Sequence, residues 1–65
     1  MNELKININL DNDAFYPQPR ENKEVARILM ELAEKIEKGI KPGFLHDING
    51  NKVGQVTYFY EVKGA

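Results

Sequence analysis

Few side chains in this sequence could act as a nucleophile or as a general base. The 65 residues include no serine and no cysteine, Thr57 is the only aliphatic hydroxyl, and His46 is the only histidine. A nucleophilic site pairs a hydroxyl or thiol with a nearby base, and a histidine-based metal site needs several imidazoles. We therefore expect no catalytic, metal-binding or cofactor-binding residue, and we predict that the chain is not an enzyme.

Two acidic segments could be mistaken for cation sites. Asp47-Ile48-Asn49-Gly50-Asn51 carries oxygen ligands at alternate positions, as the start of a calcium loop does. A complete loop has glycine in sixth place and glutamate in twelfth, whereas here glycine is fourth and the twelfth residue is Tyr58. Asp11-Asn12-Asp13 fails the same test, so both segments are predicted to be turns.

The aromatic side chains are better candidates for a functional site. Strand alternation places Phe44, His46 and Phe59 on one face of the predicted sheet, and Phe15 or Tyr16 could join them. Such a face suits a protein partner, since aromatic residues are enriched at interfaces, or single-stranded nucleic acid, whose bases stack on aromatic rings. A third interpretation is that these rings only fill gaps at the core edge. Nine basic residues against ten acidic ones make nucleic acid unlikely.

The elements that position these residues begin with a strand and a helix. Alternating apolar residues predict a strand over 3–10. Apolar residues at helical spacing predict an amphipathic helix over 22–38, with Asn22 as its N-cap and Glu24 in its first turn. Gly39 is well placed to end this helix in a left-handed conformation.

The last third of the chain is predicted to form a hairpin over 43–62, because Asn49-Gly50 separates two apolar segments. Two registers are possible. A two-residue turn at Asn49-Gly50 would pair Ile48 with Asn51, and a turn over 47–50 with Gly50 left-handed would pair Asp47 with Asn51. We favour the second, since it leaves the Asp47 side chain free to cap the turn. A β-bulge near Gly54 would then bring Val53 to the core side.

Together these elements predict one α+β domain over residues 1–65 with β-α-β-β order, a three-stranded sheet and one amphipathic helix on one face. A right-handed crossover would place the first strand parallel to a hairpin strand. The other face has nothing to cover it, and so small a domain is marginally stable alone, so a homo-oligomer is an open alternative to a monomer. No apolar run could span a membrane and no signal peptide is recognisable, which predicts a cytoplasmic protein.

Three blocks of the sequence occur together: Asp11-Asn12-Asp13-Ala14-Phe15, then Glu24-Val25-Ala26-Arg27-Ile28-Leu29 with Leu32-Ala33, then Asp47-Ile48-Asn49-Gly50-Asn51-Lys52-Val53-Gly54. In these blocks the chain resembles a group of short uncharacterised proteins of bacteriophages and other mobile elements. The resemblance covers most of the chain and implies a bacterial host cytoplasm as the setting. It carries over no activity, because the matching blocks describe a turn, a helix stripe and a hairpin.

These observations favour a non-catalytic accessory protein that binds another protein, either of the host or a second copy of itself. We expect the partner-binding residues to be Phe44, His46, Phe59 and Tyr16. Inhibition of a host enzyme or defence complex, which is a counter-defence role, is the most specific version of this hypothesis. The alternative is a single-stranded nucleic-acid-binding module that uses the open sheet face.

Overall fold

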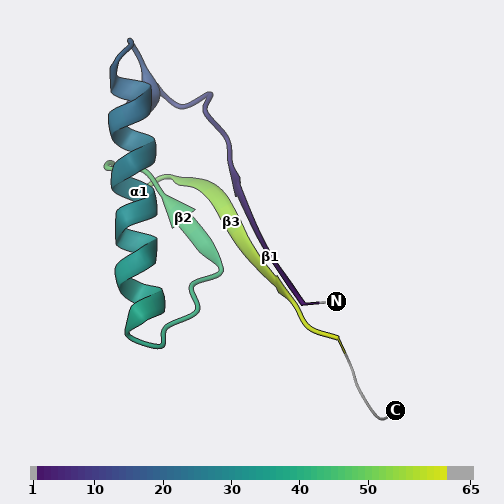
Figure 1. Cartoon of the computed structure of the whole chain (residues 1–65). Coiled ribbons are helices and arrows are strands. Elements are labelled where there is room, and N and C mark those ends of the chain that lie inside the picture. The colour runs from purple at the N-terminus through teal and green to yellow at the C-terminus, as the bar shows by residue number, and fades with distance from the viewer. Residues whose placement is uncertain (1, 62–65) are drawn as a thin grey trace.

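The computed structural model of the chain describes residues 2–61 and contains one helix beside a three-stranded sheet (Figure 1). In chain order the elements are β1 (Glu3–Ile8), the short 3-10 helix η1 (Asp13–Phe15), α1 (Arg20–Glu37), β2 (Phe44–His46) and β3 (Lys52–Phe59). The predicted α+β fold with β-α-β-β order is therefore confirmed. The predicted end of the hairpin at residue 62 lies outside the described residues.

The sheet has the order β1-β3-β2, so β3 is its central strand. Both neighbours run antiparallel to β3, which means that β1 and β2 point in the same direction without touching. The predicted parallel relation between the first strand and a hairpin strand is thus present, but β3 lies between the two. β1 ends two residues earlier than expected, although the Asn9 N–H still donates to the Val53 carbonyl at 2.7 Å.

The hairpin adopts the register that leaves Asp47 to cap the turn. The Asp47 N–H donates to the Asn51 carbonyl at 2.8 Å, the Gly50 N–H donates to the Asp47 carbonyl at 3.0 Å, and Gly50 has a φ of 84°. The pairing shifts between Leu45 and His46, where β3 carries an extra residue. This bulge turns Val53 inward, so that Val53 and Val56 are both buried, as predicted.

The helix begins at Arg20, earlier than predicted, and the predicted N-cap at Asn22 is wrong. Pro19 occupies the N-cap position instead, without a side-chain hydrogen bond to the first turn. Proline is tolerated there because the first helical turn needs no donor from it. Glu24 consequently lies beyond the first turn, which contradicts its predicted place there.

The C-terminal end of α1 agrees with the prediction that Gly39 stops the helix. Gly39 has a φ of 87°, its N–H donates to the Ile36 carbonyl, and the Ile40 N–H donates to the Lys35 carbonyl at 2.9 Å. This pair of bonds is the Schellman arrangement, which satisfies carbonyls that the end of a helix leaves without donors.

The core lies between α1, β2 and the first half of β3. Its fully buried centre is Phe15, which η1 inserts beneath the helix. Around it lie the other buried apolar residues of the cluster, namely Ile28, Leu32, Leu45, Val53 and Val56. Because Phe15 is buried, the possibility that it joins the open sheet face is wrong, and its ring instead fixes the loop before α1 to the core.

The helix covers less of the sheet than the sequence predicts. Leu4 and Ile6 lie on the helix side of β1, yet they are 47% and 40% exposed. Figure 1 shows the reason, since α1 runs beside β2 while β1 lies at the far edge of the sheet. Leu29 and Ile36 of α1 are also exposed. The helix side of the sheet is therefore incompletely covered at Leu4 and Ile6.

Candidate partner-binding face

The side of the sheet opposite α1, called here the outer face, carries the predicted aromatic residues. Phe44 and Phe59 are 51% and 46% exposed, and His46 is exposed two residues after Phe44 in β2. Tyr16 is exposed as well, but it lies between η1 and α1, outside the sheet. The structure thus brings three of the four predicted partner-binding residues to the outer face and leaves Tyr16 apart from them.

Each exposed phenylalanine of the outer face has a lysine ammonium over its ring. The Nζ of Lys52 lies 3.9 Å from the ring centroid of Phe44, and the Nζ of Lys5 lies 5.5 Å from that of Phe59. Cation–π contacts at exposed sites contribute about 0.5–1 kcal/mol. Both rings remain open to solvent beside these lysines.

These contacts were not predicted from the sequence, because they depend on which residues face each other across the strands. Lys5 lies opposite Thr57, and Phe59 lies opposite Glu3, so Lys5 and Phe59 are diagonal neighbours. Diagonal neighbours in an antiparallel pair are within reach of long and aromatic side chains. Lys5 and Phe59 both have odd numbers, and alternation along each strand places them on the same face. This pattern predicts a contact only once the register of the two strands is known.

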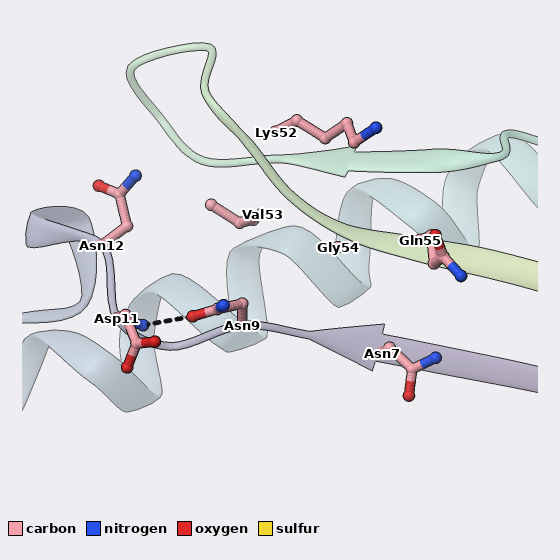
Figure 2. A pocket seen from close by; sticks show the side chains of 8 residues that line it. All are labelled: Asn7, Asn9, Asp11, Asn12, Lys52, Val53, Gly54 and Gln55. Carbon is pink, nitrogen blue, oxygen red and sulfur yellow. Dashed lines mark hydrogen bonds between the residues drawn. The ribbon is translucent and has the colours of Figure 1, made fainter.

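A hollow of about 490 Å³ lies where β1 leaves the sheet beside β3, and Figure 2 shows its lining. Its polar lining residues are Asn7, Asn9, Asp11, Asn12, Lys52 and Gln55. Within it the Asn9 Oδ1 accepts a hydrogen bond from the Asp11 N–H at 2.8 Å (Figure 2). Gln55 lies opposite Phe44 across the hairpin, so this amide-rich hollow adjoins one of the two aromatic positions.

Gly54 permits the close strand approach beneath this hollow. A Cβ atom at Gly54 would lie 2.1 Å from the Asn7 carbonyl oxygen, which is closer than two non-bonded atoms can approach. Only glycine therefore allows β1 to approach β3 so closely at this point. The position was predicted as a bulge, and the structure adds that it also fixes how tightly β1 docks.

A second group of polar residues lies on the helix side, and its role is structural. The Glu24 carboxylate is buried and accepts hydrogen bonds from the Arg27 Nε at 2.7 Å and from the Ile48 N–H at 2.8 Å. The Arg27 side chain also contacts Glu31 and donates to the His46 carbonyl. These bonds join α1 to the hairpin turn.

The charges of this group are stabilised in the folded state. The hydrogen bond from Arg27 lowers the pKa of the Glu24 carboxyl, with the Ile48 N–H adding to the effect and burial opposing it. Burial also raises the pKa of the Asp47 carboxyl, but hydrogen bonds from Asn51 and Asn49 outweigh it, so that pKa is lowered too. Both carboxylates therefore act as fixed acceptors that shape the turn.

Neither a metal centre nor a membrane span is found in the part of the chain that the structure describes. Across residues 2–61, no three histidine or acidic side chains are grouped so as to hold a metal ion. Over the same residues, no helix combines the length and apolar character needed to cross a bilayer.

Comparisons of the chain with protein-family models, with curated proteins and with solved structures find no match. The resemblance to short phage and mobile-element proteins therefore stays a prediction.

Proposed function

We propose that this chain is a non-catalytic module that binds another protein through the outer face. The observation that carries the proposal is the exposure of Phe44 and Phe59, 51% and 46%, on a face that α1 does not cover. Hydration of large exposed aromatic side chains is unfavourable in free energy. A partner that buries these side chains removes this unfavourable contribution.

The arrangement of the face also supports this proposal. Aromatic rings beside polar groups are typical of binding hot spots, where an anchor that the partner buries is surrounded by contacts that exclude water. Here the ammonium groups of Lys5 and Lys52 lie over the two rings, and the amides of the hollow adjoin Phe44. A partner surface with apolar pockets flanked by carboxylates would match this pattern.

Affinity capture with matched variants tests the proposal. The immobilised chain, its double variant Phe44→Ser with Phe59→Ser, and the control Met30→Ser would be incubated with bacterial lysate and the retained proteins identified by mass spectrometry. Met30 is 68% exposed on α1, so its variant removes a similar exposed apolar group from another surface. We expect the wild type and the control to retain the same protein and the double variant to lose it, with unchanged circular dichroism. Equal retention by the double variant would reject the outer face as the binding surface.

Single-stranded nucleic acid is the second candidate ligand, and the lysine–phenylalanine pairs are the observation that favours it. Lysine can neutralise phosphates while aromatic rings stack on bases. The near-neutral total charge opposes it, since nine basic residues are balanced by ten acidic ones. Fluorescence anisotropy with single-stranded oligonucleotides at low salt decides the matter, because a strand-binding face would give a salt-dependent rise in anisotropy that the double phenylalanine variant loses.

A phage or mobile-element setting, with a host enzyme or defence complex as the protein that is bound, remains the most specific form of the proposal. It rests on the sequence resemblance alone. The capture experiment tests it directly, because the retained protein would then be a host enzyme or a component of a defence complex.

A further inference from the structure

The free edge of β1 has the features of a strand that pairs with another strand. β1 is an edge strand of the sheet, because among residues 2–61 it pairs with β3 alone. An edge strand presents unpaired backbone N–H and C=O groups, and proteins usually shield such edges. This edge has neither a proline nor a bulge within Glu3–Ile8, and α1 lies at the opposite side of the sheet (Figure 1).

The register identifies which backbone groups face that edge. The Asn9 N–H donates to the Val53 carbonyl, and Asn7, two residues earlier in the chain, pairs with Gln55. In an antiparallel pair, successive residues direct their backbone groups to opposite sides. The odd-numbered residues of β1 therefore bond β3, and the even-numbered ones direct their N–H and C=O groups to the free edge. Those residues are Leu4, Ile6 and Ile8.

The same three residues are the apolar residues of β1. Their side chains lie on the helix side, where Leu4 and Ile6 are about half exposed and Ile8 is partly buried. Leu4, Ile6 and Ile8 thus carry both the backbone groups that face the free edge and the apolar side chains that the helix covers incompletely. A strand with the same alternation, added at this edge, would satisfy the backbone groups and cover the side chains together.

We propose that a second copy of this chain occupies the edge, with the two β1 strands paired antiparallel around a twofold axis at Ile6. In this register Leu4 lies opposite the partner's Ile8, and each even-numbered pair can exchange two backbone hydrogen bonds. On the outer face Lys5 lies opposite the partner's Asn7. The two three-stranded sheets become one continuous sheet with both helices on the same side.

Charge and pattern favour this register over those whose axis is shifted toward the N-terminus of β1. A shift that aligns Lys5 with the partner's Lys5 places like charges directly opposite each other, which is destabilising. A shift that centres the axis on Leu4 pairs Glu3 with the partner's Lys5, but it leaves Ile6 opposite a polar residue. An exposed ion pair contributes less than burial of an additional pair of aliphatic side chains does. The net charge of −1 also means that two copies repel each other little.

Single-cysteine variants test the register, because the natural sequence has no cysteine to interfere. Ile6→Cys, Lys5→Cys and Leu4→Cys each place a thiol at the axis of one register, and Met30→Cys on exposed α1 measures collision-driven crosslinking. Opposite residues on paired strands are within disulfide range. We expect Ile6→Cys to form a disulfide dimer several-fold faster than the other three under mild oxidation. A rate no higher than that of Met30→Cys, or a faster Lys5→Cys or Leu4→Cys, would overturn the proposal.

Sedimentation equilibrium provides a second test that introduces no cysteine. Asn7→Glu places a carboxylate opposite the partner's Lys5 and should tighten the dimer roughly twofold or more, whereas Asn7→Lys should weaken it. Asn22→Glu and Asn22→Lys, on the exposed side of α1, are the matched controls and should leave dimerisation unchanged. A monomer at every concentration up to high micromolar would overturn the proposal. The double phenylalanine variant should still dimerise, so loss of partner capture and loss of dimerisation are separable results.

Discussion

At the scale of single residues, Gly54 decides whether β1 can dock on β3. We predict that Gly54→Ala destabilises the chain by about 1–3 kcal/mol, because its Cβ would meet the Asn7 carbonyl oxygen and force the strands apart. Gly43→Ala is the control, since a Cβ there has no atom within 4 Å and should change stability by about 0.5 kcal/mol or less. Urea denaturation measures both values, and equal effects of the two variants would contradict the prediction.

Glu24 is a buried acid whose polar contacts join α1 to the hairpin turn. Glu24→Gln keeps the shape of the side chain but removes its charge, so the buried bonds from Arg27 and from the Ile48 N–H weaken. We predict a loss of about 1–3 kcal/mol. Glu31→Gln changes the more exposed partner of the same arginine and should cost less than about 1 kcal/mol. If thermal or urea unfolding gives Glu31→Gln the larger loss, the structural role assigned to Glu24 is wrong.

At the scale of elements, the contact between α1 and the hairpin turn should make stability depend on pH. The pKa values of Glu24 and Asp47 are lower in the folded chain than their ordinary values, so the folded state binds fewer protons than the unfolded state. This contribution is fully present above the ordinary pKa values and is lost as the pH falls through the lowered ones, below about pH 4.

Urea unfolding at a series of acidic pH values checks this expectation. The double variant Glu24→Gln with Asp47→Asn should be less stable at neutral pH and should lose less stability on acidification than the natural chain. An identical slope of unfolding free energy against pH in both proteins would mean that these two carboxyls do not control the acid response.

The elements that the sequence predicted well are those fixed by local interactions. The hairpin register follows from Asp47 and Gly50, whose preferences act within one turn. The end of α1 at Gly39 follows from the same kind of local preference. The helix start was missed because the local preference of asparagine for the N-cap position favours Asn22, whereas the helix begins after Pro19, which makes no side-chain cap bond.

At the scale of the whole molecule, the sequence predicted which face carries Phe44 and Phe59 but not how far the helix reaches. Alternation assigns residues to a face without giving the order of the strands. The order β1-β3-β2 places β1 farthest from α1, and this leaves Leu4 and Ile6 exposed on the side that was expected to be covered. The lysine contacts and the amide-rich hollow were missed for the same reason, since they join residues from different strands.

The exposed edge of β1 gives a prediction for hydrogen exchange along a single strand. In the monomer, the N–H groups of Lys5 and Asn7 bond β3, whereas those of Leu4 and Ile6 face solvent. We predict that protection alternates along β1 at low protein concentration, and that Leu4 and Ile6 become protected at high concentration as the two β1 strands pair. Amide exchange followed by nuclear magnetic resonance resolves each position.

The variant Ile6→Glu supplies the control for this alternation. It places two carboxylates against each other at the twofold axis, so pairing should fail and Leu4 should exchange rapidly at both concentrations, while Lys5 and Asn7 stay protected by β3. Concentration-independent exchange at Leu4 and Ile6 in the natural chain would show that the edge stays unpaired. Protection that rises equally at odd and even positions would instead indicate a general stabilisation of the fold, because only strand pairing distinguishes the two sets of amides.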